Sequence, residues 1–190
     1  MAISLTDKAH GAALFKLFEC LGKDLPEMYF SLETGSSNSA YLLNGYDPKN
    51  SKRIQVGLFI KLSNKRASPW RYSYYKEHQD EIAFFKEQCG EAFSIFVNGD
   101  DGFACMDFEG LKEVLDDYHE EQEWVSISRK PKQAYRVNGN DGKLDKALPI
   151  NSFPGVIIRY FEREFNDVKP STRSEIFTLR NLVSIFSKRP

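Results

Sequence analysis

Apolar residues recur in two kinds of spacing along this chain, and these spacings predict helices interleaved with strands. Between residues 5 and 21, leucine and phenylalanine return every three or four positions, as on one face of an amphipathic helix. The segments 76–89 and 153–165 show the same spacing, and a shorter helix is expected after Asp107. Residues typical of helix ends stand at the expected boundaries: Thr6, Gly22, Gly90, Asp107 and Ser152.

Shorter apolar runs between these helices predict strands, at 28–32, 40–43, 54–62, 71–75, 92–97, 103–106, 124–128 and 134–137. The run 54–62 is nearly continuous in apolar residues, which is typical of a strand covered on both faces. Residues 71–75 would either add a strand or lead directly into the next helix. Helices and strands alternate without a strict βαβ order, so we expect an α+β fold, or a mixed α/β one. Its central sheet would be mostly antiparallel or mixed and flanked by helices.

The length of 190 residues suits one globular domain, which we place at residues 1–165. Residues 166–190 are expected to form a linker and a C-terminal amphipathic helix that opens with a capping box at 172–175. That helix would dock on the domain or on a partner, and its apolar stripe makes Leu179 and Phe186 candidate partner-binding residues.

The sequence also limits where the protein would work. No apolar run approaches about 18 residues, and the N-terminal residues lack the pattern of a secretory signal, so neither a membrane span nor secretion is expected. No lipidation motif suggests binding to a membrane surface. Cys20, Cys89 and Cys105 are odd in number and widely spaced, which favours free thiols in the cytoplasm over a disulfide framework.

The near-balance of charge hides a division by position. The chain has 26 basic and 27 acidic residues, for a net charge of −1. Residues 77–123 contain 15 acidic and two basic side chains, a net of −13, and the rest of the chain carries +12. By contrast, residues 49–76 contain eight basic side chains and no acidic one, and 124–136 contain four and none. Such a division bears on partners and association rather than on fold.

The basic stretch 61–76 interleaves cations with aromatic and hydroxyl residues, and a second basic loop lies at 129–132. Lysine and arginine neutralise phosphates, and an aromatic ring stacks on an unpaired base. We therefore expect a non-catalytic nucleic-acid-binding surface, for DNA or RNA, if the sheet brings the two loops together. Its candidate residues are Lys61, Lys65, Arg66, Trp70, Arg71, Arg129, Lys130 and Lys132.

Two alternatives stand beside this expectation. Trp70, Tyr72 and Tyr74 alternate as on a strand whose aromatic face packs in the core, which would leave the cations solvated or paired with the acidic segment. The acidic face at 107–123, or the C-terminal helix, would instead serve as a protein–protein interaction surface.

Motifs for catalysis and cofactors are largely missing. The chain has no GxxxxGK[ST], GxGxxG, GxSxG, CxxC or HExxH string, so no cofactor and no metal ligand is assigned. Acidic residues at 100–101 and 140–143 lie in sequences that favour hairpin turns and lack the EF-hand spacing.

The order helix, two strands, a strand ending in Lys61 and a helix resembles the core of restriction-endonuclease-like (PD-(D/E)xK) nucleases over about residues 5–90. The resemblance implies a metal-dependent nuclease using Mg²⁺, with an acid two residues before the lysine. Here that position is Phe59, so Glu33 or Asp47 would have to supply metal ligands. The sequence therefore keeps a divergent or inactive nuclease as an alternative, and a non-enzymatic function is favoured over it.

Overall fold

The computed structural model describes residues 2–35 and 37–167, and within these it contains four α-helices and eight strands. The helices are α1 (Leu5–Asp24), α2 (Lys76–Cys89), α3 (Phe108–Lys112) and α4 (Ser152–Asn166). The strands are β1 (Tyr29–Thr34), β2 (Ala40–Asp47), β3 (Lys52–Ser63), β4 (Trp70–Tyr75), β5 (Ala92–Asn98), β6 (Phe103–Asp107), β7 (Gln122–Ser128) and β8 (Arg136–Gly139). The expected C-terminal helix, with Leu179 and Phe186, lies outside the described residues.

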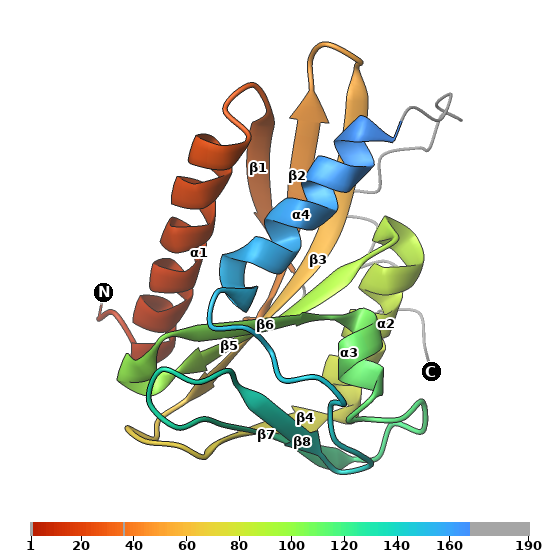
Figure 1. Cartoon of the computed structure of the whole chain (residues 1–190). Helices are drawn as coiled ribbons and strands as arrows, with labels where there is room; N and C mark the ends of the chain where they lie inside the picture. Colours follow the sequence, from red (N-terminus) through yellow and green to blue (C-terminus); the bar gives the residue numbers. More distant parts are fainter. Residues whose placement is uncertain (1, 36, 168–190) are drawn as a thin grey trace.

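The larger sheet, sheet A, has the strand order β1-β2-β3-β5-β6. The first three strands are antiparallel, β5 runs parallel to β3, and β5 and β6 form the expected antiparallel hairpin. Figure 1 shows α1 and α4 lying across one face of this sheet. Apolar residues of both helices form one core with alternate residues of β3, including Val56, Leu58 and Ile60.

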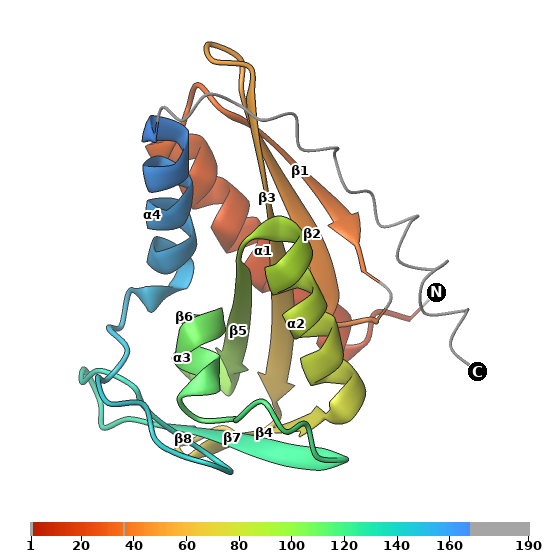
Figure 2. The same cartoon turned by 90° about the vertical axis from the view of Figure 1, so that its right-hand side faces the viewer.

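The smaller sheet, sheet B, is antiparallel with the order β4-β7-β8. Figures 1 and 2 show it lying below sheet A, with α2 above it. Its inward residues form a second core with α2 and the other face of sheet A. The expected α+β fold with a mixed sheet is thereby confirmed.

Glycine 57 shows how tightly α2 lies against β3. A Cβ atom at this position would come within 2.4 Å of the Cβ of Phe85 on α2, so only glycine allows the helix to approach the strand this closely. Helix α2 ends as expected at Gly90, which has a left-handed φ of 83°. The helix that connects the two parallel strands is therefore held against the middle of sheet A.

Two expected helix caps are wrong. Ser4, not Thr6, caps α1: its hydroxyl accepts a hydrogen bond from the backbone N–H of Asp7, and the helix continues past Gly22 to Asp24. Ser152 is not an N-cap, because Asn151 precedes the helix and the Ser152 hydroxyl instead accepts a hydrogen bond from the Cys105 N–H. A tertiary contact has taken up a side chain that local sequence assigns to capping. Asp107 caps α3 as expected.

Within residues 2–35 and 37–167, no helix has the length and apolar character needed to cross a membrane.

Candidate nucleic-acid interface

The structure brings the two basic loops of the sequence together. Strands β4 and β7 are antiparallel, with Trp70 opposite Ile127, so the loop before β4 and the loop after β7 lie at the same end of sheet B. A hydrogen bond of 3.1 Å from the Arg129 N–H to the Ser68 hydroxyl joins the loops directly. We call this the basic end; its cations are Lys65, Arg66, Arg129, Lys130, Lys132 and Arg136.

The outward side chains of sheet B extend from the basic end across a face without a carboxylate. Burial alternates along β4, β7 and β8, so every second side chain points away from the core. The outer face of sheet B consists of Arg71, Ser73, Tyr75, Gln122, Trp124, Ser126, Ser128, Arg136 and Asn138. The guanidinium of Arg71 lies 4.9 Å from the centre of the Trp124 ring, so an arginine and an indole are stacked on this face.

Trp70, expected as the stacking residue, is in the core. Its side chain is 2% exposed, and its indole N–H donates a hydrogen bond of 3.1 Å to the backbone carbonyl of Lys65. The prediction that Trp70 stacks on a base is therefore wrong, and the alternative that Trp70, Tyr72 and Tyr74 face the core is confirmed. Trp124, which is half-buried on the outer face, is the ring that the sequence reasoning missed. The alternation of Trp124, Ser126 and Ser128 with Val125 and Ile127 was the signal that would have found it.

Lys61 is also separated from the surface that we expected it to join. Its ammonium donates to Nδ1 of His78 at 3.0 Å and lies 5.3 and 5.0 Å from the rings of Phe59 and Tyr74. Burial lowers the pKa of Lys61 to about 8. Burial, together with the nearby Lys61 charge, lowers the pKa of His78 to about 4, so this imidazole is a neutral acceptor near pH 7. Lys61 is a half-buried amine behind sheet B rather than a phosphate contact.

Most cations of the candidate set form no ion pair within the part of the chain that the structure describes. Arg129 forms an ion pair of 2.6 Å with Asp101 and lies over the ring of Tyr135. The other charged candidates form no ion pair with any residue of 2–35 or 37–167. These candidates are Lys61, Lys65, Arg66, Arg71, Lys130 and Lys132. The alternative expected these cations to be solvated or paired with the acidic segment, and both occur. Arg129 pairs with Asp101, and Lys76 of the same basic stretch pairs with Asp80. The other charged candidates apart from Lys61 are exposed.

A cavity of about 320 Å³ opens at the basic end between the two loops. Its polar lining is cationic or neutral, and it comprises Ser68, Ser128, Arg129, Lys130, Gln133 and Arg136. A second cavity of about 530 Å³ shares Ser128 and Arg136 and extends to Lys143 and the carboxylate of Asp145. Cations that can reach a common anion beside hydroxyl donors provide the chemistry of a phosphate-binding site.

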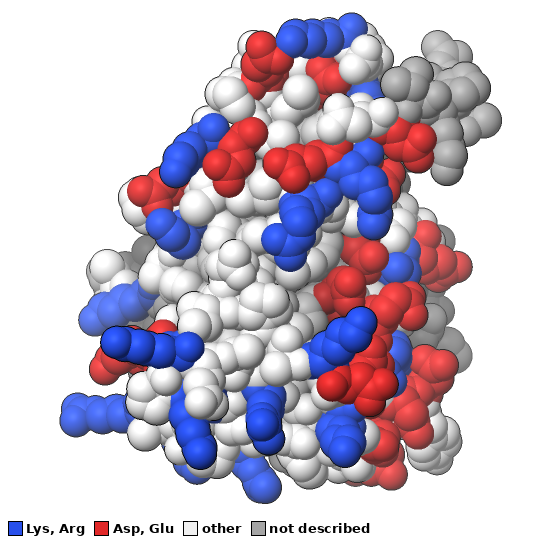
Figure 3. All heavy atoms as spheres, viewed as in Figure 1, with Lys and Arg blue, Asp and Glu red and all other residues white. Residues whose placement is uncertain are grey.

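The opposite end of sheet B has the reverse charge. We call it the acidic end; its carboxylates are Asp80, Asp117, Glu120 and Glu121, and they line a cavity of about 740 Å³ with Lys76, Tyr118 and His119. Here the cations are paired: Lys112 lies 3.2 Å from Asp117, and Lys76 lies 3.8 Å from Asp80, whose carboxylate also contacts Nδ1 of His119 at 2.8 Å. Figure 3 shows blue side chains along the lower edge of the molecule and red ones gathered on its right side.

The residues required by the nuclease comparison do not meet. Asp47 pairs with Lys52, nine residues along β3 from Lys61, which corresponds to about 30 Å. Both Asp47 oxygens accept hydrogen bonds within its own turn, from the Lys49 N–H and the Asn50 side chain. Phe59 lies in the core beneath Lys61. The folded chain therefore does not bring Asp47 to Lys61.

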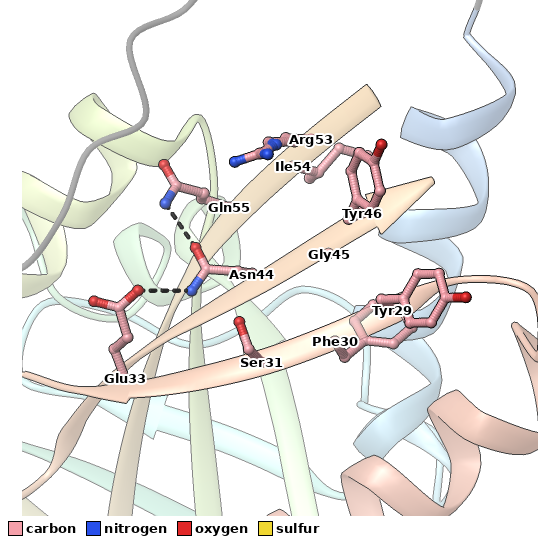
Figure 4. Close-up of a pocket in the computed structure, with 10 residues that line it drawn as sticks. All are labelled: Tyr29, Phe30, Ser31, Glu33, Asn44, Gly45, Tyr46, Arg53, Ile54 and Gln55. Atoms are coloured by element: carbon pink, nitrogen blue, oxygen red, sulfur yellow. Dashed lines mark hydrogen bonds between the residues drawn. The ribbon is translucent and has the colours of Figure 1, made fainter. Parts of the chain in front are cut away.

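Glu33 lies at another position on sheet A, in a row of polar side chains (Figure 4). It accepts a hydrogen bond of 3.1 Å from the Asn44 amide, whose oxygen accepts one of 2.6 Å from Gln55. The three side chains line one wall of a cavity of about 350 Å³ that also contains Tyr29, Tyr46 and Arg53. Glu33 is opposite Leu42, and Leu42 is opposite Gly57, so Glu33 is two strands away from β3.

No protein-family model, curated protein or solved structure matches this chain.

Proposed function

We propose that the protein binds single-stranded nucleic acid, RNA or DNA, through the outer face and the basic end of sheet B, without catalysing a reaction. The observation that carries the proposal is the contact of the exposed Arg71 with the half-buried Trp124 ring, on a face that has no carboxylate. It lies next to cations that form no ion pair with the described residues. An antiparallel sheet whose outer face presents aromatic rings, here Trp124 and the exposed Tyr75, offers a platform for an unpaired base, since every base has a π-face.

The cations at the basic end supply the contacts that do not depend on base sequence. Lys130 and Arg136 line the cavity between the loops, where a phosphate group would also find the hydroxyls of Ser68 and Ser128. The free thiols Cys20, Cys89 and Cys105 fit the cytoplasmic location that we propose with this function.

Fluorescence anisotropy with a labelled single-stranded oligonucleotide tests the proposal. We expect Lys130→Glu combined with Arg136→Glu to weaken binding at least about ten-fold for any base sequence, and to reduce the salt slope by about 1.4, since each single-strand phosphate contact contributes about 0.7. Trp124→Ala is expected to lose about 1–3 kcal/mol, the contribution of one stacked base, with a smaller change in the salt slope.

Lys23→Glu is the control for charge reversal away from the site, because it makes one such reversal at the exposed C-terminal turn of α1, at the far end of the molecule in Figure 1. It should bind as the unaltered protein does. Absence of binding at low ionic strength, or equal weakening by Lys23→Glu, would refute the proposal. Preference for a duplex over a single strand would contradict the role of Trp124.

A second candidate function, docking of a basic protein segment, is supported by one observation at the acidic end. Tyr118 is 76% exposed and lies in the cavity lined by Asp117, Glu120 and Glu121. An exposed aromatic ring among carboxylates is suited to lysine and arginine side chains. Tyr118→Ala should weaken binding of such a partner and leave nucleic-acid binding unchanged.

A further inference from the structure

Three carboxylates from separate segments meet next to sheet B. Asp116 lies in the loop after α3, Glu123 lies in β7, and Asp141 lies in the turn after β8. One oxygen of each carboxylate lies within 4.8 Å of the other two. The backbone holds these segments together: the Asp141 N–H donates to the Val114 carbonyl, and the Asp116 N–H donates to the Asp141 carboxylate at 3.1 Å.

Glu123 points into this cluster from the core. It is 1% exposed, and its Oε1 atom has no hydrogen-bond donor among the described residues. The amide of Gln79 donates to its other oxygen, and Gln79 is itself 2% exposed, with a side-chain oxygen that also has no partner. A buried carboxylate oxygen without a donor is costly unless its charge is compensated, so this cluster is suited to a positively charged partner.

Basic side chains of the described chain do not supply that partner. Lys112 is the closest in sequence, and its ammonium contacts the backbone carbonyl of Asp116 at 2.7 Å and the carboxylate of Asp117 at 3.2 Å. None of the ion pairs among residues 2–35 and 37–167 involves Asp116, Glu123 or Asp141.

We propose that Asp116, Glu123 and Asp141 bind one hard divalent cation, of the calcium and magnesium class. The ligand set contains oxygen only, which favours these ions over zinc or copper. The unpartnered amide oxygen of Gln79 is the candidate for a neutral fourth ligand. A cation here links the loop after α3, β7 and the turn after β8, and so fastens sheet B to the rest of the fold independently of any nucleic acid.

Terbium luminescence tests the site on the full chain, because Trp124 follows Glu123 directly and would sensitise a bound Tb³⁺ ion. We expect saturable Tb³⁺ emission that Ca²⁺ or Mg²⁺ displaces, and the ion that displaces at the lower concentration identifies the preferred one. Calorimetry should give one Ca²⁺ per chain with a Kd of about 10⁻⁵ to 10⁻³ M, if calcium is that ion.

Glu123→Gln and Asp141→Asn should each weaken cation binding at least about ten-fold, because affinity follows the ligand charge count. Asp145→Asn, at an exposed carboxylate of the same segment, is the matched control and should bind normally. Without cation, Glu123→Gln should be at least as stable as the unaltered protein, yet it should lose the increase in Tm that saturating cation produces. No binding up to about 10 mM cation, or binding unchanged in both variants, would overturn the proposal.

Discussion

The two ends of sheet B lie on the same strands and have opposite charge. At the basic end, Lys65, Lys130 and Arg136 extend from loops and strand ends without a carboxylate partner among the described residues. At the acidic end, each nearby cation is already engaged, as in the pair of Lys76 with Asp80. The lesson is that a net charge of −1 describes neither end. A partner meets one local field or the other.

Distance keeps these two fields apart. From Trp70 to Tyr75, β4 spans about 17 Å. The Debye length in physiological salt is about 8 Å, so a charge at one end is largely screened at the other. Only a few nucleotides of a nucleic acid bound at the basic end would therefore contact sheet B before the strand reached the acidic end. A longer strand would have to leave the surface.

The two ends of sheet B should differ most in how much their side chains contribute to stability, and the largest loss is expected from the core beneath the basic end. Trp70 fills that core and fixes the Lys65 carbonyl, so Trp70→Ala should lower the free energy of unfolding by about 3–5 kcal/mol. Tyr118→Ala removes an exposed ring at the acidic end and should change it by less than about 0.5 kcal/mol. Urea unfolding followed by circular dichroism measures both. A loss below about 1 kcal/mol for Trp70→Ala would contradict the packing described.

Lys61 differs from the exposed cations of the basic end, because it belongs to the basic stretch in sequence but lies inside the fold. Its folded-state pKa of about 8 is below the ordinary value of 10.5, so the unfolded chain binds more protons between these pH values. The free energy of unfolding should therefore rise with pH there, by about 2 kcal/mol from pH 7 to 9.5 relative to Lys61→Met.

Chemical denaturation of both proteins across this pH range isolates the contribution of Lys61, since other groups titrate alike in the two. Lys52→Met, which removes a cation from the other end of β3, is the control. Its free energy of unfolding should change with pH as that of the unaltered protein does. Parallel stability curves for the unaltered protein and Lys61→Met would show that the amine is not desolvated as described.

The local parts of the fold were predictable from sequence because local chemistry determines them. Gly90 ends α2 because it adopts a left-handed backbone conformation. Asp107 caps α3 because its carboxylate accepts a hydrogen bond from the backbone N–H of Gly110, three residues ahead. The hairpin of β5 and β6 follows from the turn residues between two apolar runs. The meeting of the loops 64–69 and 129–135 was expected only on the condition that a sheet joined them.

The composition of the candidate site was less predictable, because strand pairing decides it. Sequence places Lys61, Trp70 and Arg71 in one stretch, and the fold sends them to a half-buried site, the core and the outer face. Trp124 and Arg136 join the site only because β7 and β8 pair beside β4. The proposed cation site at Asp141 was hidden for a similar reason, since its ligands come from a loop, a strand and a turn that meet only in the folded chain.

The smallest effect should come from the acidic end itself. Asp117→Asn with Glu121→Gln removes two exposed negative charges about 17 Å from the basic end, about two Debye lengths in physiological salt. Nucleic-acid affinity should then rise less than about three-fold in physiological salt, and more at 10 mM ionic strength, where the Debye length grows to about 30 Å. Anisotropy titrations at the two ionic strengths measure the difference. A large increase in physiological salt would mean that the two ends act as one field, and the footprint on sheet B would then have to extend across the whole sheet.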